Sequence, residues 1–183
     1  FRDSVAALDE RVPEPNRRQN RPEVPDTAHS EGFFNTADTD PSLPQNLAWG
    51  RAILERVPSS RLGSDLVRAH TVTSSDRLDT IVAAASDAGL DWGTRSAADR
   101  AAVLERVARR LEARRADLLE IMAAEGGKTL DESDPEVSEA IDFARYYADR
   151  ARDLAAVDGA RFVPSALTVV TPPWNFPVAI PAG

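Results

Sequence analysis

The sequence predicts an α/β protein whose visible part is mainly helical and leads into the first strand of a doubly wound sheet. Apolar residues recur at helical spacing in several segments between residues 45 and 148. An apolar run of β-branched character, residues 166–171, then ends at Pro172 and Pro173, because proline cannot continue the hydrogen bonding of a strand. In such sheets the turns at the carboxyl ends of strands are where ligands bind.

The composition argues against several classes of protein. The 183 residues include no cysteine and two histidines, which excludes disulfides and indicates no metal centre. A net charge of -8 argues against nucleic acid as a partner. No apolar run is long enough to span a membrane, and the N-terminus lacks the pattern of a signal peptide. We therefore expect a soluble, cytoplasmic protein.

The N-terminal part of the chain is rich in proline. Residues 1–44 hold six of the 13 prolines, and residues 13–30 are predicted to be a linker with little fixed structure. Residues 4–11 are helix-like, and the chain opens with Phe1 instead of methionine, so we expect further residues upstream. The chain thus divides into a largely irregular linker, 1–44, and a folded part, 45–183.

The folded part begins with two predicted helices. The first covers residues 45–57. The second covers residues 76–88, where Ser75 is expected to cap the N-terminus and Gly89 to provide a left-handed exit. Residues 91–94 are then predicted to form a loop.

The longest predicted helix covers residues 97–124 and is capped by Ser96. The pair Gly126-Gly127 is expected to end it. Its many arginines alternate with acidic residues, which favours a solvated face over an anion-binding site.

A fourth helix is predicted from a polar cap, a proline and an acid in succession. The pair Ser133-Asp134 would supply a short polar cap, Pro135 would occupy the first helical position, and Glu136 would lie at the positive end of the helix dipole. Its buried stripe is predicted to consist of Val137, Ile141, Ala144 and Ala148.

The segment 171–177, Thr-Pro-Pro-Trp-Asn-Phe-Pro, is expected to form a rigid turn. Pro177 suits the first turn of a following helix, so Trp174, Asn175 and Phe176 would be displayed between strand and helix. The amide of Asn175 can donate to an oxygen that gains negative charge during attack on a carbonyl. From residue chemistry alone, however, a structural role is favoured, in which Asn175 satisfies turn backbone and the two aromatic residues fill a core.

Two segments resemble a known family. The run 173–183, PWNFPVAIPAG, resembles the PWNFP segment of the NAD(P)-dependent aldehyde dehydrogenase superfamily. Residues 127–148, GKTLDESDPEVSEAIDFARYYA, are similar to a helical stretch of L-glutamate γ-semialdehyde dehydrogenases, particularly those of bifunctional proline-utilisation proteins. The resemblance covers approximately residues 34–183. It implies that residues 45–183 are the N-terminal part of an aldehyde dehydrogenase domain that leads into a Rossmann-type NAD-binding domain.

The resemblance also implies roles for residues of the turn. Asn175 would be catalytic, since the matching Asn stabilises the oxyanion of the thiohemiacetal formed by a catalytic cysteine. Thr171, Pro173 and Trp174 would contact NAD. Phe176 would offer an aromatic wall to the aliphatic part of the substrate.

Glu139 has two interpretations. It lies two residues from Val137, and this spacing alone predicts exposure to solvent and an ion pair with a neighbour such as Arg145. The resemblance implies instead that Glu139 faces the substrate pocket, where its carboxylate would bind the substrate's α-ammonium group.

The implied activity is oxidation of glutamate semialdehyde to glutamate in proline catabolism, with NAD as cofactor and FAD only if a proline dehydrogenase domain lies upstream. The implied partners are a small-molecule substrate and, for the full-length protein, further copies in a homo-oligomer. Because the chain has no cysteine, we expect the nucleophile and the general base downstream, and no activity from these 183 residues alone. Two alternatives remain: an aldehyde dehydrogenase of other substrate preference, and a non-catalytic helical module that binds a partner.

Overall fold

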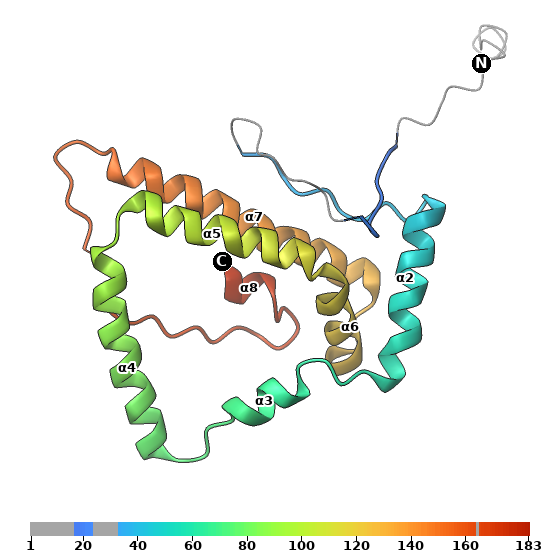
Figure 1. The fold of residues 1–183 in the computed structure, drawn as a ribbon, viewed down its shortest axis with the longest axis horizontal. Helices are drawn as coiled ribbons and strands as arrows, with labels where there is room; N and C mark the ends of the chain where they lie inside the picture. The colour runs from blue at the N-terminus through green and yellow to red at the C-terminus, as the bar shows by residue number, and fades with distance from the viewer. Residues whose placement is uncertain (1–16, 24–32, 164) are drawn as a thin grey trace, which may run out of the picture.

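Helices form the whole of the regular structure in the described part of the chain, which is residues 17–23, 33–163 and 165–183 of a computed structural model (Figure 1). The helix-like segment 4–11 and most of the predicted linker 13–30 lie outside these residues. The elements are α2 (Pro44–Arg56), the short 3-10 helix η1 (Val57–Ser59), α3 (Ser64–His70), α4 (Ser75–Thr94), α5 (Ala97–Ala113), α6 (Arg115–Gly126), α7 (Leu130–Ala155) and α8 (Ala179–Ala182).

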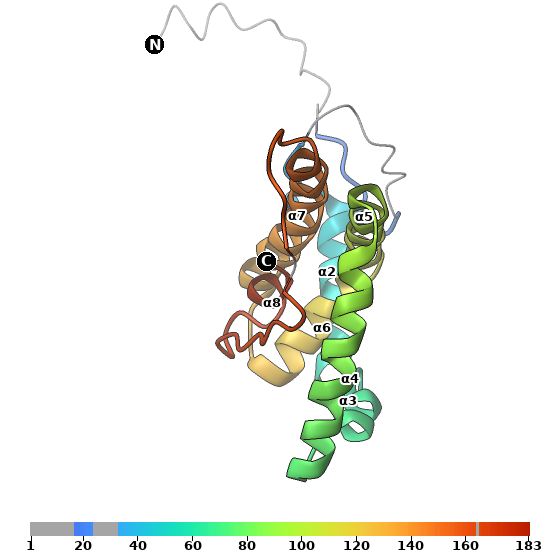
Figure 2. The ribbon, with the colours of Figure 1, turned by 90° about the vertical axis from the view of Figure 1, so that its left-hand side faces the viewer.

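The core lies where α5 and α7 run side by side and α2 and α6 cover one end of the pair (Figures 1 and 2). Alanines on α5 and α7 are fully buried, and their small side chains let the two helices approach closely. Ile53, Leu119 and Ile141 are the largest apolar side chains in this core. The buried stripe predicted for the fourth helix, Val137 to Ala148, is confirmed.

An N-terminal arm, residues 17–23 and 33–43, lies against these helices without forming a helix of its own. Arg21 donates to Glu112 on α5 at 2.8 Å, and the backbone N–H and hydroxyl of Thr39 donate to Asp134 on α7 at 2.5 and 2.7 Å. Asp134 also accepts a 2.9 Å hydrogen bond from Arg115 at the start of α6. Burial, followed by the nearby charge of Arg115, lowers the pKa of Arg21 below its usual value.

The single helix predicted over residues 97–124 is wrong, because the chain breaks into α5 and α6 at Arg114. The backbone of Arg114 leaves the helical region (φ -108°, ψ 14°). This break lets Arg115 turn inwards, where its guanidinium is 2% exposed and pairs with Glu112 and Asp134. The predicted end of the helix is confirmed, since Gly127 adopts a left-handed conformation (φ 66°) immediately after α6.

The second predicted helix is longer than expected. Ser74, not Ser75, caps it by accepting a 3.3 Å hydrogen bond from the N–H of Arg77, and it continues to Thr94 through the predicted loop 91–94. Gly89 therefore lies inside α4 and does not end it. A Cβ at this position would be 1.7 Å from the carbonyl oxygen of Ala166, so glycine is required for close approach of the later segment.

The fourth helix also begins earlier than predicted, at Leu130. Thr129 and Glu132 form a capping box, in which the Glu132 carboxylate accepts from the N–H and the hydroxyl of Thr129, each at 3.0 Å. These hydrogen bonds, first that from the N–H, hold the pKa of Glu132 below its usual value. Pro135 consequently lies within α7. The polar pair predicted to cap the helix, Ser133-Asp134, is buried inside it.

The strand predicted over residues 166–171 is not confirmed. Within the described residues no segment forms a β-ladder: Ala166 lies in a bend, and residues 167–171 have no regular structure and no backbone hydrogen bond to a neighbouring segment. A strand exists only when another strand pairs with it, and the described residues offer none. The helix after the turn does form, although α8 begins at Ala179, two residues beyond Pro177.

Helices α3 and α4 extend away from the α5 and α7 pair (Figures 1 and 2) and have no buried residue. Leu78, Ile81 and Val82, on one face of α4, are 52%, 41% and 43% exposed. No helix in the described part of the chain is long and apolar enough to cross a membrane.

Candidate functional site

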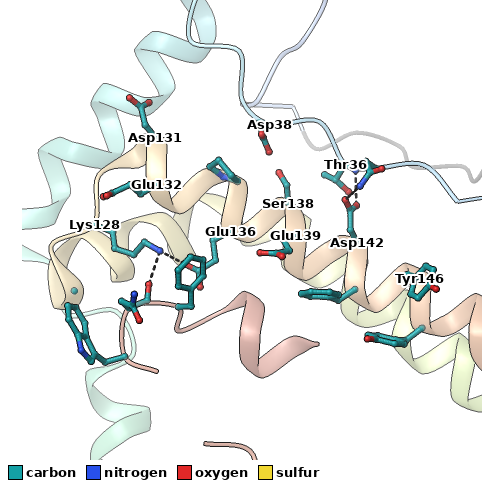
Figure 3. Close-up of a pocket in the computed structure, with 18 of the residues that line it drawn as sticks. Thr36, Asp38, Lys128, Asp131, Glu132, Glu136, Ser138, Glu139, Asp142 and Tyr146 are labelled. Carbon is teal, nitrogen blue, oxygen red and sulfur yellow. Dashed lines mark hydrogen bonds and ion pairs between the residues drawn. The ribbon is translucent and has the colours of Figure 1, made fainter. Parts of the chain in front are cut away.

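A pocket of about 1070 Å³ lies along α7 and is closed on one side by the turn that contains Asn175 (Figure 3). Residues of α7 from Asp131 to Tyr147 form its floor. The loop 126–128 and the turn 174–176 form one end, and the arm residues 33–38 form the opposite side. Three segments that are far apart in the sequence therefore meet at this pocket.

Lys128 and Glu136 hold the turn in place. The ammonium group of Lys128 donates to the backbone carbonyl of Asn175 at 3.0 Å and forms an ion pair with Glu136 (Figure 3). The other carboxylate oxygen of Glu136 accepts hydrogen bonds from the N–H groups of Val178 and Ala179, at 2.7 and 3.1 Å. The backbone is thus held at Asn175 itself and at the residues three and four positions after it.

These contacts satisfy charges that are removed from water. The side chain of Glu136 is 1% exposed and that of Lys128 is 12% exposed. A buried carboxylate is stable only when paired and hydrogen-bonded, and Glu136 uses both of its oxygens. The Lys128 nitrogen also lies 4.6 Å from the centre of the Phe176 ring, within the range of a cation–π interaction. The turn is therefore attached to the helix by ionic, polar and aromatic contacts.

Four of the residues singled out in the sequence line this pocket together: Glu139, Trp174, Asn175 and Phe176. Asn175 is exposed, and within the described residues its side-chain amide forms no hydrogen bond. Trp174 is 81% exposed and Phe176 39% exposed, so neither ring fills the core. Thr171 and Pro173 are exposed in the segment before Trp174 and do not line the pocket.

Glu139 lies three residues after Glu136, on the same side of α7 (Figure 3). Its carboxylate is exposed and forms no ion pair within the described part of the chain. Arg145, the neighbour that spacing alone suggested as its partner, donates to the hydroxyl of Thr36 at 2.9 Å instead. Glu139 is therefore free to bind a positively charged group.

The opposite end of the pocket is aromatic. Phe143 stacks on Tyr147 with ring centres 6.1 Å apart, and Tyr146 meets Tyr147 edge to face at 5.4 Å. Asp142 accepts hydrogen bonds from the side chain of Asn35 at 2.8 Å and from the N–H of Thr36 at 2.7 Å, which attaches the arm to this end of the helix. Glu139 and these aromatic rings line the same pocket. An acid together with aromatic rings suits a ligand that combines an ammonium group with an aliphatic chain.

Sequence reasoning missed Lys128 as a site residue and misjudged Glu136. The acid was predicted to stabilise the start of its own helix. Helix α7 begins at Leu130, six residues before Glu136, so Glu136 does not lie in its first turn. Instead its carboxylate accepts hydrogen bonds from the N–H groups at the start of α8. The sequence contains only two weak signals for these residues. Lys128 directly follows Gly127, the left-handed glycine at which the chain turns. Glu136 is followed three residues later by a second acid, Glu139.

The chain belongs to the aldehyde dehydrogenase family. The family profile matches residues 58–183, from η1 to the last residue of the chain. The fold of the chain matches part of the solved structure of proline utilization A (PutA) from Corynebacterium freiburgense. The TM-score is 0.67 and the sequence identity 41%, and the match covers 85% of this chain and 15% of that one.

The sequence is also similar to parts of two bacterial proteins. The chain is 36% identical over 120 residues to 1-pyrroline-5-carboxylate dehydrogenase 2 of Bacillus subtilis (strain 168), over 60% of this chain and 23% of that protein. It is 41% identical over 92 residues to the bifunctional protein PutA of Escherichia coli (strain K12), over 50% of this chain and 7% of that protein. The chain thus spans less than a quarter of the length of either relative.

Proposed function

We propose that this chain is the N-terminal part of an NAD-dependent L-glutamate γ-semialdehyde dehydrogenase, which oxidises the semialdehyde to glutamate in proline catabolism. The observation that carries the proposal is the position of Asn175. Its backbone carbonyl is held by Lys128, its side-chain amide has no hydrogen-bond partner among the described residues, and the residue lines a pocket that Glu139 also lines. The relatives named for 1-pyrroline-5-carboxylate dehydrogenation support the choice of substrate.

In this proposal Asn175 stabilises the transition state of the first chemical step. A thiolate attacks the aldehyde carbon, a C–S bond forms, and the electron pair of the C=O bond moves to oxygen. The amide N–H of Asn175 donates to that oxygen as its negative charge develops. The chain contains no cysteine, so we expect the thiolate and the base that activates the hydrolytic water to come from downstream residues.

NAD, when bound, accepts the hydride that leaves the carbonyl carbon. We expect Thr171, Pro173 and Trp174 to contact it. Their exposure is compatible with this role, since Thr171 and Pro173 are exposed and the indole of Trp174 is open to a ligand. FAD would be needed only by an upstream proline dehydrogenase domain. For the full-length protein we expect a homo-oligomeric enzyme in the cytoplasm.

Replacing Asn175 by alanine in the full-length protein tests the oxyanion assignment. We expect kcat to fall on the order of 100-fold or more, while the affinity for NAD stays largely unchanged, because the amide acts mainly on developing charge. Asn20, an exposed asparagine of the arm outside the pocket, provides the matched control Asn20→Ala, whose kcat should equal that of the wild type. An Asn175→Ala enzyme as fast as the control would refute the assignment.

Glu139→Gln tests the substrate. Loss of a charge-assisted hydrogen bond worth about 1.5–3 kcal/mol should raise KM for glutamate semialdehyde roughly 10- to 100-fold. Turnover of propanal, which has no amino group, should be unaffected. An equal effect on both aldehydes would favour the alternative, an aldehyde dehydrogenase of other substrate preference.

A further inference from the structure

We propose that Lys128 and Glu136 are a positioning pair that sets the direction of the Asn175 side chain and thereby controls its use as an oxyanion donor. This inference rests on the proposed function of Asn175. Lys128 and Glu136 would act through the backbone of the turn and would not touch the substrate. The pair differs in this respect from Asn175 and Glu139, whose proposed roles require contact with the reacting molecule.

The turn contains little that fixes its own conformation. Its one internal backbone hydrogen bond in the described structure runs from the N–H of Phe176 to the carbonyl of Pro173 at 3.3 Å, at the long end of the usual range. Trp174 and Asn175 are exposed, and the following helix α8 is only four residues long. The conformation of the turn therefore depends on contacts with the rest of the molecule.

Lys128 and Glu136 make those contacts, at the carbonyl of Asn175 and at the residues that follow it. Lys128 donates to the carbonyl of Asn175 itself, which restricts rotation of the peptide that follows the Asn175 Cα. Glu136 binds the N–H groups three and four residues further on, those of Val178 and Ala179. The Asn175 Cα is thus held relative to α7, and its side chain is aimed accordingly.

The backbone of both residues belongs to elements other than the turn. Glu136 belongs to the buried face of α7, next to Val137 and Ala140 in the core, and Lys128 follows the left-handed Gly127 that ends α6. Glu136 neutralises Lys128 and also orients its ammonium group towards the Asn175 carbonyl. Removal of either residue should release the turn while α7 remains folded.

The test uses Lys128→Met in the full-length enzyme, with Arg152→Met as the matched control. Arg152 also pairs with a carboxylate, that of Glu105, but on an exposed surface away from the pocket. Lys128→Met keeps a long apolar side chain and removes the charge and the hydrogen bond. We expect kcat to fall about 10- to 100-fold, since misplacement of a catalytic group by about 1 Å has an effect of this size. KM for the aldehyde and for NAD should rise by a smaller factor than kcat falls, because Phe176 and Trp174 lie on the same turn, whereas only the transition state uses the amide of Asn175.

Glu136→Gln is the second variant. The amide retains one oxygen but loses the charge that pairs with Lys128, so we expect a similar loss of kcat. Hydrogen exchange supplies a readout besides activity: the N–H groups of Val178 and Ala179 should exchange faster in both variants than in Arg152→Met. Lys128→Arg keeps the charge and a donor, and it should recover most of the lost kcat.

A double variant separates positioning from general loss of structure. If Lys128 acts through Asn175, then Lys128→Met should cause no further loss of kcat in an Asn175→Ala background. An equal loss in both backgrounds would overturn the inference, as would a kcat of Lys128→Met equal to that of Arg152→Met. If Asn175→Ala has the kcat of the wild type, the proposed function fails. If Asn175→Ala lowers kcat but Lys128→Met does not, the positioning inference fails and the proposed function stands.

Discussion

Replacement of Arg115 by methionine should be among the most destabilising single changes in this chain. The guanidinium donates to the Asp134 carboxylate at 2.9 Å, to the Asp134 carbonyl and the Ser138 hydroxyl at 3.1 Å each, and to Glu112 at 3.0 Å. Methionine fills similar space but donates nothing. Two buried carboxylates would then lose their shared cation.

The expected magnitude follows from what remains after the substitution. Removal of one member of a buried ion pair costs about 3–5 kcal/mol. Glu112 would still accept from Arg21, and Asp134 would still accept from Thr39, so the lower end of that range, about 3 kcal/mol, applies.

Urea unfolding followed by the circular dichroism of the helices measures this loss. With a urea dependence of about 1–3 kcal/mol/M, the midpoint should fall by roughly 1–3 M. Arg152→Met removes a half-exposed arginine from an ion pair with Glu105 and should cost less than about 1 kcal/mol. If Arg115→Met destabilises the protein no more than Arg152→Met, the buried ion pairs of Arg115 do not hold the arm and helices α5, α6 and α7 together.

Two further substitutions test local features of the fold. Replacing a glycine by alanine inside an ordinary helix is stabilising by about 0.5–1 kcal/mol. Gly89→Ala should instead lower the melting temperature, because the new Cβ would lie 1.7 Å from the carbonyl oxygen of Ala166. A higher melting temperature would contradict the close approach. Glu132→Gln tests the capping box through pH: the folded-state pKa of Glu132 lies below its usual value, so its charge stabilises the protein above pH of about 4.5 and this contribution is lost as the pH falls through the folded-state pKa. The melting temperature of the wild type should therefore exceed that of Glu132→Gln at pH 7, and the difference should shrink towards pH 3; a difference that does not depend on pH would argue against the charge.

The helices could be predicted from the sequence where apolar spacing and chain-ending residues agreed. Gly127 is an example, since a glycine with positive φ follows the last apolar residues of α6. The break at Arg114 could not be predicted, because arginine is a good helix former and only the buried partners of Arg115 reveal why the chain turns there. The strand over 166–171 has suitable side chains, but pairing depends on a neighbour that a local pattern does not contain.

The candidate site was predictable only in part. Residue chemistry by itself favoured a structural role for Asn175, and the family resemblance reversed that preference. The grouping of Asn175 with Glu139 in one pocket agrees with the resemblance. Lys128 and Glu136 escaped prediction because their partners lie 47 and 42 residues away, and no local spacing rule connects residues at such separations.

Glu136 and Glu139 lie one turn apart on the same rigid helix, α7. The first fixes the turn that carries the proposed oxyanion donor, and the second is the proposed partner of the substrate's amino group. A helix rises about 1.5 Å per residue, so Glu136 and Glu139 keep a separation of about 4.5 Å along the axis when α7 moves as one body. Any displacement of α7 would therefore carry the attachment of the turn and the proposed contact for the amino group together, without changing the spacing between them.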